Sequence, residues 1–251
     1  MAEDVTRVLL VTGGGRGIGA ATARLAAQRG YAVCVNWRRD EAAARSVVQS
    51  IVAGGGRAGA VGGDVANEAD VVRMFEAAQA LGPLAAVVNN AGILERQMRL
   101  DEMEAARFTR VMAVNVTGML LCAREAVRRM STRHGGHGGA IVNVSSMAAR
   151  LGAPGEYVDY AASKGAVDAL TIGLAKEVAA EGIRVNAVRP GVIYTEIHAS
   201  GGEPGRVDRV KSAVPMQRGG APEEVARAIL WLLSDEASYC TGTFIDVSGG
   251  R

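Results

Sequence analysis

The residue types best suited to proton transfer gather in one stretch of the chain. Tyr160 and Lys164 stand four positions apart in a segment with helical spacing, so the phenol and the ammonium share one helix face. A positive charge beside a phenol favours its ionised form, and a tyrosine whose pKa is ordinarily about 10 then becomes a usable acid or base nearer neutral pH. This spacing also occurs on ordinary helix surfaces, but it predicts general acid–base chemistry if a binding site adjoins it.

A glycine-rich turn near the N-terminus indicates such a site. Thr12-Gly13-Gly14-Gly15-Arg16-Gly17-Ile18-Gly19 follows the first apolar run and leads directly into a helical pattern. Glycines let main-chain N–H groups approach pyrophosphate oxygens closely, and a helix N-terminus adds partial positive charge. No Lys-Ser or Lys-Thr follows the turn, which disfavours a nucleoside triphosphatase. The predicted dinucleotide contacts here are Gly13, Gly15, Arg16, Gly17, Ile18 and Gly19.

The second apolar run ends in Trp37, Arg38 and Arg39, without the acidic residue that would bind the ribose 2'-hydroxyl of NAD. Arg38, helped by Arg39 or Arg16, can instead bind a 2'-phosphate through planar, charged donors. The alternative is that these arginines only solvate a strand end. The prediction is that NADP(H) is preferred and that NAD(H) can also be used.

Further predicted contacts follow other strands, at the carboxyl edge where open α/β sheets bind ligands. Asp64 is expected either to bond the adenine amino group or to cap the next helix, while Asn89 and Gly92 are expected against the adenosine ribose. The complete set from these strand ends is Asp64, Val65, Asn89, Ala91, Gly92, Pro190, Gly191, Val192 and Thr195.

The elements that must position these residues alternate along the whole chain. Short β-rich runs at 7–12, 31–36, 57–61, 84–89, 139–145, 183–188 and 243–247 are separated by helical patterns at 17–29, 40–53, 67–81, 101–130, 157–181 and 222–234. This alternation predicts an α/β fold, a Rossmann-type doubly wound parallel sheet of about seven strands with helices on both faces. The chain is expected to form one domain over 1–251, with a substrate lid at about 192–220.

Composition excludes several classes of protein. A formal net charge of +2 and ten aromatic residues argue against a nucleic-acid surface, and no apolar run is long enough for a membrane span. The acidic N-terminus, residues 1–4, lacks the basic start of a secretory signal. Three scattered cysteines indicate reduced thiols and a cytoplasmic protein, and His134 and His137 in a glycine-rich turn indicate no metal site.

Taken together, these motifs resemble the short-chain dehydrogenase/reductase family in its compact one-domain form. The similarity covers T-G-x-x-x-G-x-G at 12–19, N-N-A-G at 89–92, Asn115 in a long helix, Ser146, Y-x-x-x-K at 160–164 and Pro190-Gly191. It is equally close to the glucose dehydrogenase and 3-oxoacyl-[acyl-carrier-protein] reductase branches.

The resemblance implies a catalytic set of Asn115, Ser146, Tyr160 and Lys164. Ser146 would bond the substrate oxygen, Tyr160 would transfer the proton, Lys164 would lower the phenol pKa and contact the nicotinamide ribose, and Asn115 would hold a water. Ser145 competes for the serine role, and Thr195 resembles the residue that binds the carboxamide. The resemblance also implies a homotetramer or homodimer that pairs through the two long helices.

The leading hypothesis is therefore an oxidoreductase that transfers a hydride between NADP(H) and a small carbonyl or secondary-alcohol substrate. One alternative is a catalytically inactive dinucleotide sensor on the same fold. Another is an isomerase or dehydratase, although no longer C-terminal substrate domain is present to support it.

Overall fold

The computed structural model describes residues 7–251, so the acidic residues 1–4 lie outside the described part. Seven strands form one parallel sheet in the order β3-β2-β1-β4-β5-β6-β7. The strands are β1 Val8–Val11, β2 Ala32–Trp37, β3 Ala58–Gly62, β4 Leu84–Asn89, β5 Gly139–Val144, β6 Ile183–Pro190 and β7 Phe244–Val247. The predicted fold class is confirmed, and each predicted strand overlaps an observed one.

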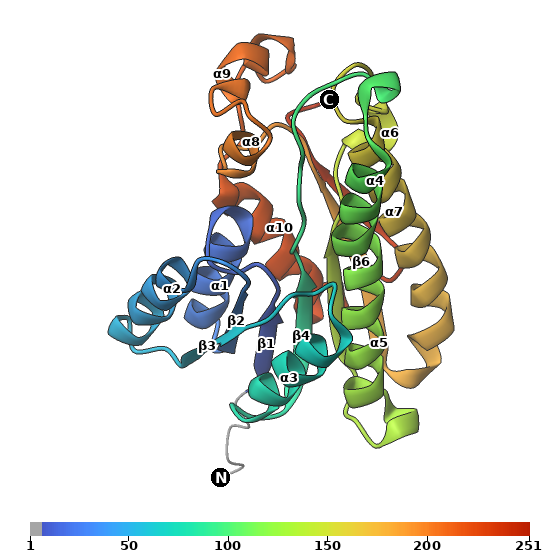
Figure 1. Ribbon diagram of the computed structural model, residues 1–251. Coiled ribbons are helices and arrows are strands. Elements are labelled where there is room, and N and C mark those ends of the chain that lie inside the picture. The colour runs from blue at the N-terminus through green and yellow to red at the C-terminus, as the bar shows by residue number, and fades with distance from the viewer. Residues whose placement is uncertain (1–6) are drawn as a thin grey trace.

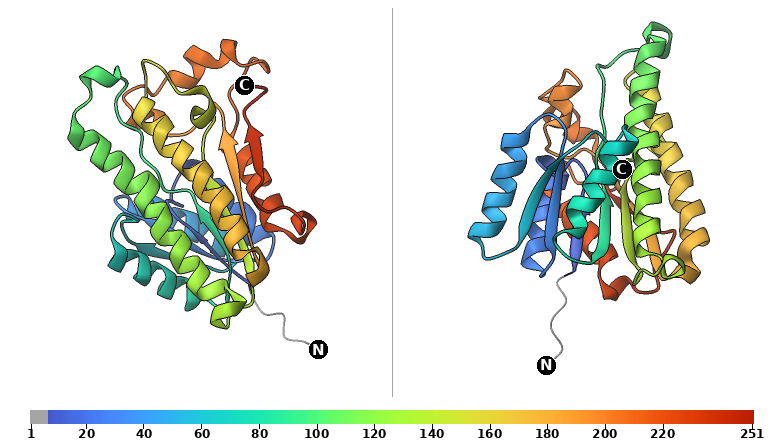
Figure 2. Two further views of the ribbon diagram at one scale, coloured as in Figure 1. Left: turned by 90° about the vertical axis from the view of Figure 1, so that its right-hand side faces the viewer. Right: turned by 60° about the horizontal axis from the view of Figure 1, so that its bottom comes forward.

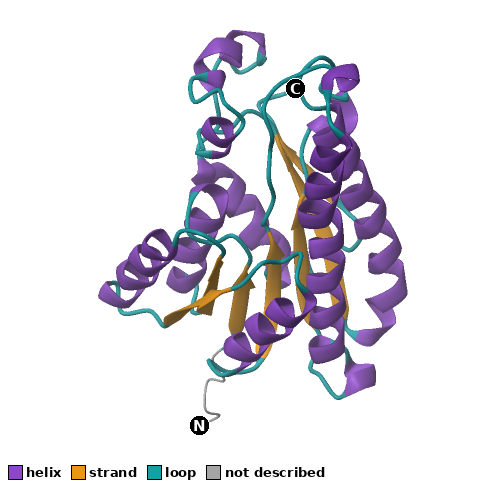
Figure 3. Ribbon diagram, in the orientation of Figure 1, coloured by secondary structure: helices purple, strands orange, loops and turns teal. Residues whose placement is uncertain are grey.

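The main helices cover both faces of the sheet (Figures 1 and 3). Helices α1, α2 and α10 pack on one face, and α3, α5 and α7 pack on the other. Their bounds are α1 Gly17–Gln28, α2 Glu41–Ala53, α3 Glu68–Gln79, α4 Ala105–Met112, α5 Gly118–Met130, α7 Val158–Val178 and α10 Pro222–Leu233. Three short helices, α6 Ala148–Leu151, α8 Ile197–Ser200 and α9 Arg206–Val210, were not predicted.

Strand β1 shows why this sequence forms a central, doubly covered strand. Its four residues are fully buried, and successive side chains point to opposite faces of a strand. Val8 and Leu10 join the core under α3 and α5, whereas Leu9 and Val11 join the core under α1 and α10. A continuous apolar run, rather than an alternating one, is what a strand buried on both faces requires.

The predicted helix over 101–130 begins a few residues later than expected, is helical over 105–130, and contains a π turn. A 3-10 turn at Leu100–Glu102 precedes α4, and a π-helical turn at Ala113–Thr117 separates α4 from α5. The predicted helix over 157–181 also ends early, because Ala179–Glu181 form a 3-10 turn before Gly182, whose φ is +77°. That left-handed conformation favours glycine and stops the helix.

The order of strands creates the crevice that holds the site. Strand β1 lies between β2 and β4, so the chain leaves the carboxyl ends of β1 and β4 in opposite directions. The segment predicted as a lid stands over this edge, next to the C-terminal residue (Figures 1 and 2). Its base is closed by two backbone hydrogen bonds, from Gly220 N to Val192 O and from Tyr194 N to Gly220 O, each 2.9 Å long.

In the part of the chain that the structure describes, no helix is both long and apolar enough to cross a membrane. The same residues contain no group of three or more His, Cys, Asp or Glu side chains arranged to hold a metal ion. Cys34 and Cys122 are buried thiols, and burial raises the pKa of each to about 12.

Candidate active site

A cavity of about 830 Å³ lies at the carboxyl edge of the sheet, from the glycine-rich turn to the lid. Most of the residues predicted to contact a cofactor or substrate line it: Gly13, Gly15, Arg16, Gly17, Ile18, Trp37, Arg38, Arg39, Asp64, Val65, Ala91, Gly92, Ser146, Tyr160, Lys164, Pro190, Gly191, Val192 and Thr195. Three predicted residues, Gly19, Asn89 and Asn115, do not line it.

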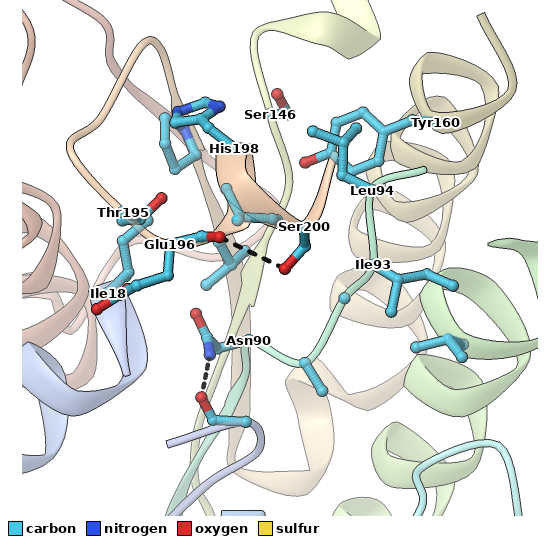
Figure 4. Close-up of a pocket in the computed structure, with 18 of the residues that line it drawn as sticks. Ile18, Asn90, Ile93, Leu94, Ser146, Tyr160, Thr195, Glu196, His198 and Ser200 are labelled. Carbon is cyan, nitrogen blue, oxygen red and sulfur yellow. Dashed lines mark hydrogen bonds between the residues drawn. The ribbon is translucent and has the colours of Figure 1, made fainter. Parts of the chain in front are cut away.

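The glycine-rich turn has the properties of an anion site. Gly13 and Gly17 have φ values of +61° and +51°, which favour glycine. Helix α1 begins at Gly17 with no side-chain cap and no acidic residue in its first turn, so its first N–H groups remain available to an anion. Thr195 of the lid lies against this turn, since a Cβ on Gly17 would be 3.1 Å from Thr195 Cγ2 (Figure 4). The turn therefore fits a pyrophosphate.

Gly19 packs behind the turn instead of facing the cavity. A Cβ at this position would lie 2.5 Å from Gly13 O and 2.6 Å from Asn90 Nδ2. Asn90 explains the close packing, because its Nδ2 donates to Thr12 O and Gly13 O at 2.9 Å each. Asn90 thus joins β4 to the glycine-rich turn and lines the cavity, a role that was not assigned to it from the sequence.

Asn89 is placed differently from the prediction. Its side chain is 2% exposed and donates to Asn143 Oδ1 of the neighbouring strand β5 at 3.0 Å. After β4, the asparagine that lines the cavity is Asn90.

The end of β2 carries the predicted arginines. Arg38 Nε lies 2.8 Å from Asp64 Oδ2, and both side chains line the cavity. Asp64 also accepts from Ala66 N at 3.0 Å, whereas Asn67 caps α3. The helix-capping alternative for Asp64 is therefore wrong, because the loop after β3 extends three residues beyond it.

One residue next to the arginines was missed. Asn36 is 2% exposed, and its Oδ1 accepts from Gly13 N at 3.1 Å. Its Nδ2 also donates to Gly63 O at 3.1 Å. Asn36 thus connects β2, the glycine-rich turn and the loop before Asp64; its only sequence signal was a polar residue at the end of an apolar strand.

At the other end of the cavity, the hydroxyl groups of Ser146 and Tyr160 face the same space (Figure 4). Ser146 Oγ accepts from Ala148 N at 3.1 Å, which fixes its direction. Ser145 points elsewhere, since its hydroxyl donates to Asp168 Oδ1 at 2.6 Å. The geometry therefore favours Ser146 over Ser145 as the serine that meets a substrate.

Lys164 lies one helical turn beyond Tyr160, with Nζ 5.5 Å from the centre of the tyrosine ring. It is 3% exposed and donates to Val144 O at 2.7 Å. Burial lowers the pKa of Lys164 to about 8, while the Asp168 carboxylate opposes the shift.

The pKa of Tyr160 differs from the prediction. The phenol was expected to titrate nearer neutral pH because of Lys164, but desolvation by the surrounding protein raises its pKa to about 12, opposed only in part by a hydrogen bond with Ser146. Lys164 shares the helix face, yet its amine is directed to the Val144 carbonyl, not to the phenol oxygen. The phenol is therefore protonated throughout the neutral range.

Asn115 occupies the π-helical turn and is fully buried. Its Oδ1 accepts from Ile93 N at 2.8 Å, and its Nδ2 donates to Ile93 O and Ser163 Oγ at 3.1 Å each. Both amide donors are used, whereas Oδ1 can accept a second hydrogen bond, so the predicted water stays a prediction. What it does is hold Ile93, which lines the cavity (Figure 4), against α7.

The predicted lid segment and three other parts of the chain supply lining residues that sequence reasoning missed or left without a role. His198 and Glu196 come from the lid (Figure 4), and Nη2 of Arg16 donates to Ser200 Oγ at 3.4 Å. The others include Leu94, Met147, Leu151, Glu156, Tyr157, Arg206 and Arg251. They lie in loops and short helices without a periodic pattern, so their convergence on the cavity could not be predicted from the sequence.

The parallel sheet, the uncapped helix behind a glycine-rich turn and the cavity at the switch point define a Rossmann-type dinucleotide-binding protein. Residues 13–251 match the family described as Enoyl-(Acyl carrier protein) reductase. An uncharacterized oxidoreductase, YgfF, from Escherichia coli is 63% identical over 97% of this chain and 99% of its own. The 3beta-hydroxysteroid dehydrogenase 1 of Eggerthella lenta is 41% identical over 100% of this chain and 95% of its own.

A solved structure agrees with these sequence matches. The 3-ketoacyl-(acyl-carrier-protein) reductase of Brucella melitensis, complexed with NADH, has a TM-score of 0.89 at 34% identity and covers 98% of both chains. The chain belongs to the short-chain dehydrogenase/reductase family, as its motifs predicted. It is an oxidoreductase of alcohol or carbonyl groups that works with a nicotinamide dinucleotide.

Proposed function

We propose that this enzyme transfers a hydride between NADP(H) and a carbonyl or secondary-alcohol substrate, with Tyr160 as the general acid or base. The observation that carries the proposal is the convergence of the Ser146 and Tyr160 hydroxyls on one space in the cavity. The bound nicotinamide supplies or accepts the hydride.

In this proposal the chain's own side chains handle the substrate oxygen and its proton. Ser146 donates a hydrogen bond to that oxygen, and Tyr160 gives it a proton during reduction. A phenol with a pKa of about 12 is protonated at neutral pH, which suits the reductive direction. Lys164 contacts the nicotinamide ribose and adds positive charge near the phenol, and Asn115 holds the cavity wall in place through Ile93.

The preference for NADP(H) rests on Arg38. Its guanidinium borders the cavity just after β2, and the strand itself ends without an acidic residue to bind the 2'-hydroxyl of NAD. The Asp64 carboxylate pairs with Arg38 Nε at 2.8 Å, and Asp40 also lines the cavity, so the proposal needs the rest of the Arg38 guanidinium to meet the 2'-phosphate. Arg39 and Arg16 line the same region. The Brucella reductase was solved with NADH, which supports use of NAD(H) as a second cofactor.

The substrate is proposed only as a class. Two of the relatives act on different compounds by their names, a 3beta-hydroxysteroid and a 3-ketoacyl-(acyl-carrier-protein). A ketone or secondary alcohol is the description that these compounds share. We also propose a cytoplasmic homodimer or homotetramer. Exposed apolar residues on the two long helices, Leu120 on α5 and Ile172 on α7, support pairing through these helices.

The test is incubation of the purified protein with NADPH and a panel of ketones that includes steroids, 3-oxoacyl thioesters and cyclic ketones. The proposal predicts NADPH consumption with at least one ketone and formation of the matching alcohol. NADPH binding without turnover of any compound would contradict it and favour the dinucleotide-sensor alternative.

A further inference from the structure

A buried ion pair lies next to Tyr160 and takes no part in the chemistry described above. Arg107 of α4 and Asp159 of α7 have side chains that are 5% and 3% exposed. Arg107 Nε donates to Asp159 Oδ2 at 2.7 Å, and Nη2 donates to Oδ1 at 3.0 Å. This two-bond arrangement fixes both the distance and the direction between the helices.

The third nitrogen of the same guanidinium reaches the cavity wall. Nη1 of Arg107 donates to the backbone oxygen of Arg96. The segment around Arg96 runs from Leu94, which lines the same cavity as Tyr160 (Figure 4), to Met98, whose N donates to Glu156 O at 3.2 Å. One side chain therefore joins α4, the Leu94–Met98 segment and the start of α7.

The position of Asp159 makes this junction relevant to proton transfer. Asp159 lies in the first turn of α7 and immediately precedes Tyr160, so the two Cα atoms are about 3.8 Å apart. The helix begins after Tyr157 without any side-chain cap. The ion pair therefore restrains this turn from α4, and Ser163 Oγ, which donates to Tyr160 O at 2.7 Å, restrains it from within α7.

A buried ion pair is not an efficient source of stability, because the desolvation of both charges offsets much of their attraction. Apolar residues of the same size would fill the space between α4 and α7 as well. What the pair supplies instead is a fixed geometry and charge neutrality beside Tyr160.

We propose that Arg107 and Asp159 are positioning residues. Their ion pair holds Tyr160 and the Leu94–Met98 segment in the relative position that proton transfer to the substrate oxygen requires. This inference rests on the proposed function, since it assigns the pair to the same tyrosine. The pair touches neither substrate nor cofactor and acts only through its neighbours.

The charge of the pair gives a test that a purely structural role would not pass. Arg107→Met leaves an unpaired carboxylate next to Tyr160 in the chain and moves the pH at which kcat changes to a higher value, because a negative charge disfavours the phenolate. Asp159→Asn leaves an unpaired guanidinium and moves this pH to a lower value. The double variant Arg107→Met/Asp159→Asn restores the wild-type pH dependence.

Other charged or titratable groups around Tyr160 stay unchanged in these variants. On its own helix there is Lys164, and Glu156 and Tyr157 precede that helix. The lid contributes Glu196, His198 and Arg206, the Leu94–Met98 segment contributes Glu95, α4 contributes Arg110, and the C-terminal residue is Arg251.

The experiment measures kcat and KM in both reaction directions as a function of pH, together with NADPH affinity by fluorescence. In the single variants kcat should fall about 10- to 100-fold, the usual effect of misplacing a reacting group, while NADPH affinity changes little. Arg107→Lys keeps the charge, but its single nitrogen cannot reproduce the planar two-bond contact with Asp159 and also reach Arg96 O, so it should retain the wild-type pH dependence with a reduced kcat. Arg99→Met is the matched control, because Arg99 pairs with Asp101 on the surface of the same region.

Wild-type kcat and pH dependence in all the pair variants would overturn the inference. So would a parallel loss of kcat and NADPH affinity in folded Asp159→Asn or Arg107→Lys, which would show general support of the fold. If Arg107→Met fails to fold, Asp159→Asn and Arg107→Lys decide the question. Absence of turnover in the wild type, or a fully active Tyr160→Phe variant, would instead refute the proposed function.

Discussion

Lys164 carries a cost in stability that the structure allows us to predict with its pH dependence. The amine is 3% exposed, and burial lowers its pKa from 10.5 to about 8. Between these two values the unfolded chain holds more protons than the folded one, so the stability of the wild type rises as pH increases through this window. Lys164→Met removes the group from both states and loses this dependence.

The magnitude follows from the displaced pKa. Of the range from pH 7 to pH 9.5, about 1.5 pH units lie above the folded-state pKa of Lys164. Each of these units raises the free energy of unfolding of the wild type by about 1.4 kcal/mol. The free energy of unfolding of the wild type should therefore gain about 2 kcal/mol relative to Lys164→Met over this range. The Val144 carbonyl, which loses its donor in the variant, adds a constant penalty at all pH values.

The assay is urea unfolding of both proteins at pH 7 and pH 9.5, with ketone reduction measured alongside. Other titrating groups, including Tyr160 and the buried cysteines, are present in both proteins and cancel in the comparison. We expect the variant to lose turnover while its relative stability is highest at pH 7. A stability difference that does not change with pH would refute the assignment of a depressed pKa to Lys164.

Three further substitutions test other parts of the site. Arg38→Asp should weaken NADPH binding about 100-fold, the loss expected for charged hydrogen bonds to a phosphate, and NADH binding far less; equal losses in titrations with the two cofactors would show that Arg38 does not bind the 2'-phosphate. Ser146→Ala should lower kcat about 100-fold, whereas Ser145→Ala should mainly lower the unfolding temperature; the reverse pattern would exchange their roles. Gly19→Ala should destabilise the protein by about 1–3 kcal/mol in urea unfolding and weaken both cofactors, because the new Cβ meets Gly13 O at 2.5 Å; wild-type stability and affinity would refute this packing.

The sheet could be predicted because each of its strands has a recognisable local pattern in the sequence. Short apolar runs bounded by glycine, such as Val8–Val11 before Gly13, are typical of strands buried on both faces, and parallel strands must place their following loops at one edge. This is also why the cofactor side of the site could be assembled from sequence: its contacts are turns at fixed positions after strands.

The features that differ from the sequence-based predictions depend on contacts between segments that are far apart in the chain. Helical spacing continues through Asn115, so nothing local reveals that its amide bonds Ile93 and that the backbone widens into a π turn there. The choice between Asn89 and Asn90 depends on the neighbouring strand β5, where Asn143 bonds Asn89. Asp64 pairs with Arg38 only because β2 and β3 are neighbours.

The pKa values of the site residues also could not be predicted from the sequence. The i, i+4 spacing of Tyr160 and Lys164 indicated a lowered phenol pKa, but the spacing says nothing about burial, which dominates for both groups. In the same way, the short helices of the lid have no periodic pattern, so the positions of Glu196 and His198 in the cavity follow only from three-dimensional structure.

The central claim, that Tyr160 carries the proton, is tested most directly by Tyr160→Phe. The substitution removes only the phenol oxygen and leaves the ring that packs in the cavity. With a ketone substrate identified from the panel, NADPH consumption by the variant should fall about 10²- to 10⁴-fold, while NADPH affinity stays close to that of the wild type. A variant that binds NADPH normally and keeps most of its reductase activity would contradict the claim.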